Sequence, residues 1–125
     1  MDIEIKEKLS NGIIKFNNKE YYESHEYFED VWINYTLEDR LFIQALIQLS
    51  VAYFHISNQN KNGAIGLFKK CIKKLDIYKD SNSFIININQ VIDSAHRSFL
   101  YVQKIDNMSE FNWDLAPKLK VKDEF

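Results

Sequence analysis

Apolar side chains recur three and four positions apart along most of this chain, which is the spacing of one face of an α-helix. The first example contains Ile5, Leu9, Ile13 and Phe16. Pro117 is the only proline and there are only three glycines, so few residues interrupt helices before the last part of the chain. The pattern predicts five helices, over about residues 3–17, 19–35, 37–57, 61–78 and 84–105.

The third predicted helix, over about residues 37–57, is apolar on most of its sides. A helix of this kind is usually central and buried. Thr36 followed by Asp39 resembles a capping box at its start, and Asn60 is suited to cap the fourth helix. The fold class is therefore all-α: a compact single-domain bundle of about five helices, with the third helix buried at its centre.

We expect residues 1–106 to form this bundle and residues 107–125 to form a C-terminal tail that is partly docked on it. Phe111, Trp113 and Leu115 could supply the docking contacts. We expect the last residues, 118–125, to be frayed, as chain ends commonly are.

The composition is that of an ordinary globular protein. The chain has 125 residues, of which 46% are hydrophobic and 27% charged. The net charge of −2 argues against a dedicated nucleic-acid binder, which normally presents a basic face. A single cysteine, Cys71, cannot form an internal disulfide, and no stretch approaches the ~20 apolar residues of a membrane span. We therefore expect a cytoplasmic protein without a membrane partner.

One group of polar residues could form a site. Residues four apart on a helix differ by only ~40° around its axis, so each of the second and third helices carries a polar stripe. A short connection between the two helices makes them antiparallel neighbours, and the stripes can then face each other. The candidate residues of this cluster are Tyr22, His25, Glu26, Glu29, Trp32, Arg40, Gln44, Gln48 and His55.

Three interpretations of this cluster remain open. It could be a structural hydrogen-bonded network, because buried polar groups need partners. It could be a small-ligand pocket, since convergent polar groups in an apolar hollow are typical of binding sites. It could be a metal site for a metal-assisted hydrolase using His25 and Glu29, although the His-Glu-x-x-His zinc motif is absent. We expect no cofactor and favour binding over catalysis.

A basic strip on the fourth helix contains Lys69, Lys70, Lys73 and Lys74. We interpret it as a solvated face rather than a phosphate groove. A protein-interaction scaffold, binding a partner helix or a second copy of the chain, is a further alternative for the function.

The cluster lies within a longer ordered pattern that resembles the domain of unknown function 309 family. The resemblance covers about residues 12–79 and departs from the family at Cys71, where a small apolar residue is more usual. It implies a small, all-helical, intracellular protein and no assigned activity. The residues that carry it are Phe16-Asn17, Tyr21-Tyr22-Glu23-Ser24-His25-Glu26, Glu29, Trp32, Arg40, Phe42, Gln44-Ala45-Leu46-Ile47-Gln48, Ala52-Tyr53, His55, Asn60, Gly63-Ala64 and Leu67.

Residues 52–75 are also similar to a single tetratricopeptide hairpin. Such repeats stack on one another, and at least three copies are usually needed for stability. Only one copy is found here, so the similarity reflects ordinary packing of two helices.

Overall fold

The structure, a computed structural model, describes residues 3–34, 40–81 and 86–121. The described part of the chain is all-α, as the sequence predicted, and it contains five α-helices and three short 3₁₀ helices. The α-helices are α1 (Ile3–Asn17), α2 (Tyr21–Asn34), α3 (Arg40–Ser57), α4 (Lys61–Leu75) and α5 (Ile88–Lys104). The 3₁₀ helices are η1 (Asp76–Tyr78), η2 (Met108–Glu110) and η3 (Trp113–Leu115).

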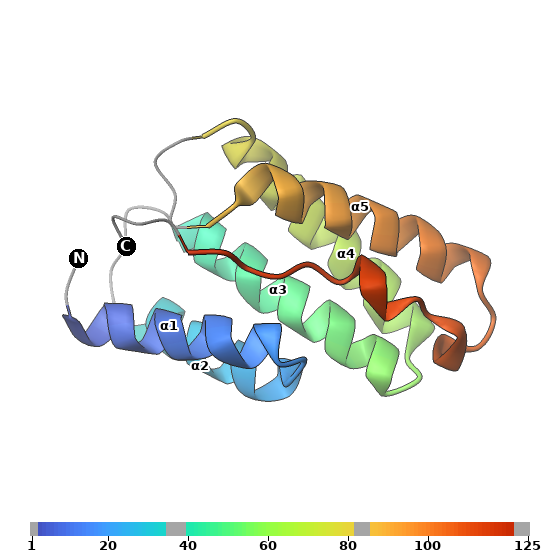
Figure 1. Cartoon of the computed structure of the whole chain (residues 1–125), viewed down its shortest axis with the longest axis horizontal. Helices are drawn as coiled ribbons and strands as arrows, with labels where there is room; N and C mark the ends of the chain where they lie inside the picture. The colour runs from blue at the N-terminus through green and yellow to red at the C-terminus, as the bar shows by residue number, and fades with distance from the viewer. Residues whose placement is uncertain (1–2, 35–39, 82–85, 122–125) are drawn as a thin grey trace.

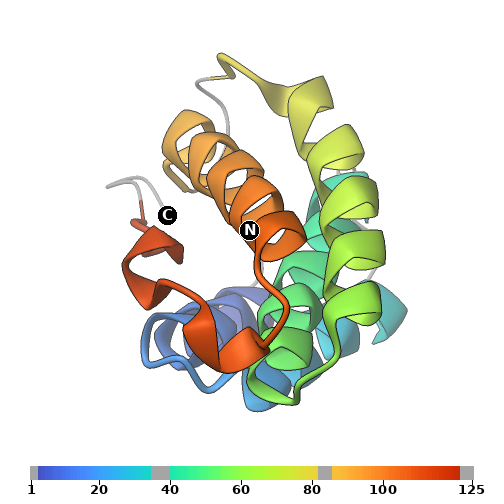
Figure 2. The same ribbon diagram turned by 90° about the vertical axis from the view of Figure 1, so that its right-hand side faces the viewer.

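Helix α3 lies at the centre of the bundle, where the sequence placed it. The α1–α2 pair lies on one side of α3 and the α4–α5 pair on the other (Figure 1). Its inward face contributes the largest share of the core, including Leu46, Leu49 and Tyr53, all fully buried. Seen from its end, α3 is flanked by α2 and α4 on the side away from the tail (Figure 2).

The core around Tyr53 is aromatic. The Tyr53 ring lies 5.2 Å from the Phe68 ring and 5.3 Å from the Tyr21 ring, and its hydroxyl is 2.7 Å from Ser98 Oγ. Ring pairs of this kind contribute about 0.5–1.5 kcal/mol beyond the area that they bury. Burial raises the pKa of Tyr53 and also that of Tyr21.

The predicted fourth helix corresponds to α4 followed by η1. Asn60 caps α4 as expected, because its Oδ1 accepts the Gly63 N–H at 2.9 Å. The predicted fourth helix ends at Leu75 as an α-helix and continues as η1 to Tyr78. The Thr36–Asp39 capping box lies outside the described residues.

The predicted start of the fifth helix is wrong. Ile86 is not helical but pairs with Val121 as an isolated antiparallel bridge, and α5 begins only at Ile88. The long-range pairing with the tail overrides the local apolar spacing of this segment.

The expectation that residues 118–125 fray is wrong for residues 118–121. Leu119 and Phe111 are buried, and residues 107–121 cross the molecule as a strap between α1 and α5 (Figure 1). Asn17 and Asn87 bind the backbone of this strap from its two sides. No helix of the described residues is long and apolar enough to cross a membrane.

Candidate functional site

The α2 stripe predicted from helical spacing is present beside α3. His25 Nε2 lies 3.6 Å from Glu29 Oε2, one helical turn away, and the His25 ring packs edge-on against Tyr22 with 4.8 Å between ring centroids. His25 Nδ1 also contacts the carbonyl oxygen of Tyr22. The Glu29 side chain is 48% exposed, so this pair is partly solvated and contributes little to stability.

A small open hollow lies between α2 and α3, with a volume of about 190 Å³. We call it the α2–α3 hollow. The residues that line it are Glu29, Trp32, Gln44, Ile47 and Gln48. Four of these five residues were candidates from the sequence. Ile47 was missed, although its position three residues after Gln44 places it on the same face.

The main polar feature of the α2–α3 hollow is an acceptor without a donor. Gln48 Oε1 is buried and has no hydrogen-bond partner. Such an atom costs about 1–3 kcal/mol. This oxygen is itself buried, and the broad terminal torsion of the glutamine side chain would have to rotate to present it to the hollow. The neighbouring Glu29 carboxylate is also an acceptor, and the hollow therefore favours a hydrogen-bond donor.

Trp32 and Arg40 form the edge of the site near the α2–α3 connection. The Arg40 guanidinium lies 4.5 Å from the centre of the Trp32 ring, within range of a cation–π interaction. The contact covers part of the indole and holds it in place, while the indole still lines the hollow. Arg40 is thus a neighbour of the hollow rather than part of its lining.

The structure does not bring Glu26 into the hollow. Glu26 is exposed and lines a separate shallow depression between α1 and α2, together with Lys15, Tyr27 and Asp30. One position of difference from His25 turns a side chain by ~100° around the helix, which is enough to move it to another face.

The structure also separates His55 from the hollow. His55 Nδ1 lies 3.3 Å from Asn60 Nδ2, at the connection between α3 and α4. A Cβ atom on Gly63 would lie only 2.9 Å from His55 Cδ2, so the glycine lets α4 approach this ring. Burial lowers the pKa of His55. The prediction that His55 joins the His25 cluster is therefore corrected, since His55 lies at the other end of α3, beside the turn that leads into α4.

The site has few side chains of the kinds that ligate a metal ion. His25 and Glu29 supply two ligand-type side chains, and within residues 3–34, 40–81 and 86–121 no group of three His, Cys, Asp or Glu side chains could hold a metal ion. Burial raises the pKa of the Cys71 thiol, which packs as a small hydrophobe in the core.

Comparison with known proteins gives one result. Residues 9–67 match a family model described as "Domain of unknown function (DUF309)". The matched segment contains all of α2 and α3 and therefore every residue of the hollow. No curated protein and no solved structure matches the chain.

Proposed function

We propose, from the geometry of the site, that this is a non-catalytic interaction domain. Residues 9–67 match the model of the domain of unknown function 309 family, whose description names no activity. The α2–α3 hollow receives one side chain of a protein partner, and that side chain carries a hydrogen-bond donor.

The observation that carries this proposal is the unpartnered Gln48 Oε1. A structural network stabilises a fold when all of its buried polar groups are paired, and a partly paired network costs free energy. Gln48 is one of the residues that line the hollow and its buried acceptor is unpaired, which supports a role toward something that binds there.

The size of the hollow indicates the size of its occupant. Pockets for drug-sized molecules have volumes of about 300–1,000 Å³. The α2–α3 hollow has about 190 Å³ and is open to solvent. A single side chain fits this volume, and the surrounding backbone of a partner would then rest on the surfaces of α2 and α3.

The charge and shape of the lining select the occupant. Glu29 favours a donor with a positive charge, while Trp32 and Ile47 offer apolar surface to an aliphatic stem. A lysine side chain combines such a stem with three donors. No observation supports hydrolysis over this binding role.

The proposal is tested by nuclear magnetic resonance on the isotope-labelled full chain, at a concentration where it is monomeric. The probe is N-acetyl-lysine methylamide, and N-acetyl-glutamate methylamide is the matched control. We expect the lysine probe to shift the indole N–H signal of Trp32 and the side-chain amide of Gln48 in a saturable manner, and the glutamate probe to shift neither.

The Gln48→Leu variant tests the residue that carries the proposal. We expect the lysine probe to leave its Trp32 indole signal unchanged. A wild-type chain that ignores the lysine probe, or a Gln48→Leu variant that responds like the wild type, would overturn the proposed function.

A further inference from the structure

Helix α3 presents a partly exposed seam between α2 and α4. Its residues alternate three and four positions apart, the spacing at which one helix packs along another. All of them retain contact with solvent. The seam residues are Leu41, Gln44, Gln48, Val51 and His55.

Helix α2 forms an acidic edge on one side of this seam. It contains Glu23, Glu26, Glu29 and Asp30 and no lysine or arginine. Four exposed residues follow one another along the outer face of α2: an aromatic residue, two acidic residues and an apolar residue. These four residues are Tyr22, Glu26, Glu29 and Ile33.

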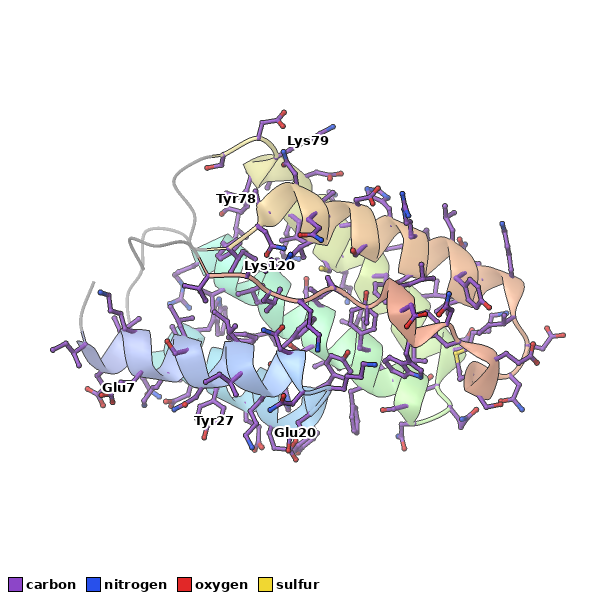
Figure 3. The ribbon with its side chains drawn as sticks, in the orientation of Figure 1. Glu7, Glu20, Tyr27, Tyr78, Lys79 and Lys120 are labelled. Atoms are coloured by element: carbon purple, nitrogen blue, oxygen red, sulfur yellow. The ribbon has the colours of Figure 1, made fainter. Side chains whose placement is uncertain are left out.

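Helix α4 forms a basic edge on the other side of the seam. It carries five lysines and no acidic residue, and the salt bridges of the described residues do not include Lys69, Lys70 or Lys73. Its outer face carries Gly66, where an added Cβ would meet nothing within 4 Å, and then these lysines. Ile77, in η1 directly after α4, continues this line and is 63% exposed. In Figure 3 the labelled Glu20 and Tyr27, near α2, lie at the bottom of the view, and Lys79, which follows η1, lies at the top.

The two edges run in the same direction from the same end of α3. The Tyr22 ring lies 5.3 Å from the Phe54 ring, and Gly63 lies against His55, so α2 and α4 both start beside the last turn of α3. A helix rises about 1.5 Å per residue, so residues equally far from these two starts lie at one level. By this count Lys70 is level with both Glu29 and Gln48.

We infer that this face binds a second copy of the chain, an inference that rests on the proposed function and names its partner. A two-fold axis parallel to α3 places α2 of each copy over α4 of the other, whereas an axis across α3 would place the acidic edges together. With the parallel axis, Glu29 of one copy faces Lys70 of the second copy, and Lys73 of the second copy lies about one turn further along.

The same arrangement pairs the remaining features of the two edges. Ile33, which is 60% exposed, comes within about one turn of Ile77 of the second copy. The Tyr22 ring covers the open surface at Gly66 of the second copy. The Lys70 ammonium of the second copy enters the α2–α3 hollow, where it donates to Gln48 Oε1 beside Glu29. Each copy contributes both a hollow and a lysine, so the contact is closed and self-complementary.

The test measures the mass of the full chain by sedimentation and light scattering, from micromolar to millimolar concentration. We expect a monomer–dimer equilibrium that weakens as salt is added, because the facing charges are screened. Two variants change the charges of one edge each: Glu26→Lys/Glu29→Lys and Lys70→Glu/Lys73→Glu. Each should weaken its own self-association by at least about tenfold, because like charges then face each other at both contacts.

Measuring the association of a mixture of the two variants tests the proposed pairing of the edges. In the mixed dimer both contacts are again between opposite charges, so we expect association close to that of the wild type. The double substitution Asp106→Lys/Glu110→Lys, in exposed positions near the tail, makes the same charge change away from the face and should leave dimerisation unchanged.

Circular dichroism of each variant verifies that the helices persist, since lysine and glutamate have similar helix propensities. A wild type that stays monomeric at every concentration, or charge variants that dimerise like the wild type, would overturn the inference. A monomeric wild type whose Trp32 signal still responds to the lysine probe would overturn the self-association alone and leave the proposed function standing.

Discussion

The Asn17 side chain forms hydrogen bonds with both the N–H and the carbonyl group of the Leu119 backbone. Asn17 Nδ2 donates to the Leu119 carbonyl at 3.0 Å, and the Leu119 N–H donates to Asn17 Oδ1 at 2.7 Å. Asn87 binds the flanking residues from the other side, donating to the Lys118 carbonyl and accepting the Lys120 N–H. Two asparagine side chains thus replace the neighbouring strands that an extended segment would otherwise need.

Substituting Asn17→Ala should lower the free energy of unfolding by about 2 kcal/mol, because two hydrogen bonds are lost and the polar groups of a buried segment lose their partner. Urea unfolding of the full chain measures this change. Asn18→Ala, at the exposed next position, is the matched control and should change stability by less than about 0.5 kcal/mol. Equal effects of the two substitutions would contradict the role given to Asn17.

Gly12→Ala should destabilise the α1–α2 contact by about 1–3 kcal/mol, since an added Cβ would lie 2.6 Å from Phe28 Cε1 in a filled core. Gly66→Ala adds the same methyl group in open space and should raise stability by about 0.5–1 kcal/mol through helix propensity. Thermal unfolding at low protein concentration compares the two. Stabilisation by Gly12→Ala would show that α1 and α2 do not approach as closely as described.

Tyr53 should make the fold sensitive to alkali. Its folded-state pKa is raised by burial above the ordinary tyrosine value of 10.0, so the unfolded chain releases the proton first, and stability is lost as pH rises above about 10. Tyr53→Phe should reduce this loss by up to about 1.4 kcal/mol per pH unit, while losing the bond to Ser98. Urea unfolding at several pH values measures how the free energy of unfolding changes with pH in the wild type and in the variant. Parallel slopes above pH 10 would exclude Tyr53 as the source.

His25→Ala should cost only about 1 kcal/mol, the value of a lost ring contact with Tyr22, because the ion pair to Glu29 is half solvated. Chemical unfolding near neutral pH measures it. A loss above about 3 kcal/mol is typical of a broken buried pair and would restore the structural-network interpretation.

The helical part of the fold was predictable from local spacing. The bounds of α1 are those predicted, and the cap at Asn60 was visible from residue type alone. The strap was not predictable, since Asn17 and Leu119 are 102 residues apart and an asparagine gives no local sign of which backbone it will bind. The same long-range pairing explains why Ile86 is extended.

The sequence predicted which residues of the candidate site share a face of the same helix. Helical spacing grouped Glu29 with Trp32 and Gln44 with Gln48, and the structure brings these four together. It also grouped His55 with the glutamines, although α4 covers that end of α3 and takes His55 into the Asn60 turn. Which neighbour covers each turn of a helix is a tertiary property that the spacing does not contain.

Under the proposed function, Gln48 serves binding and not the stability of the fold. The free energy of unfolding of Gln48→Leu, measured by urea at a concentration where the chain is monomeric, distinguishes these two roles. We expect a value equal to or above that of the wild type, by up to about 2 kcal/mol, because the substitution removes a buried acceptor that has no partner. A loss of more than about 1 kcal/mol would contradict the claim and make Gln48 part of a structural network.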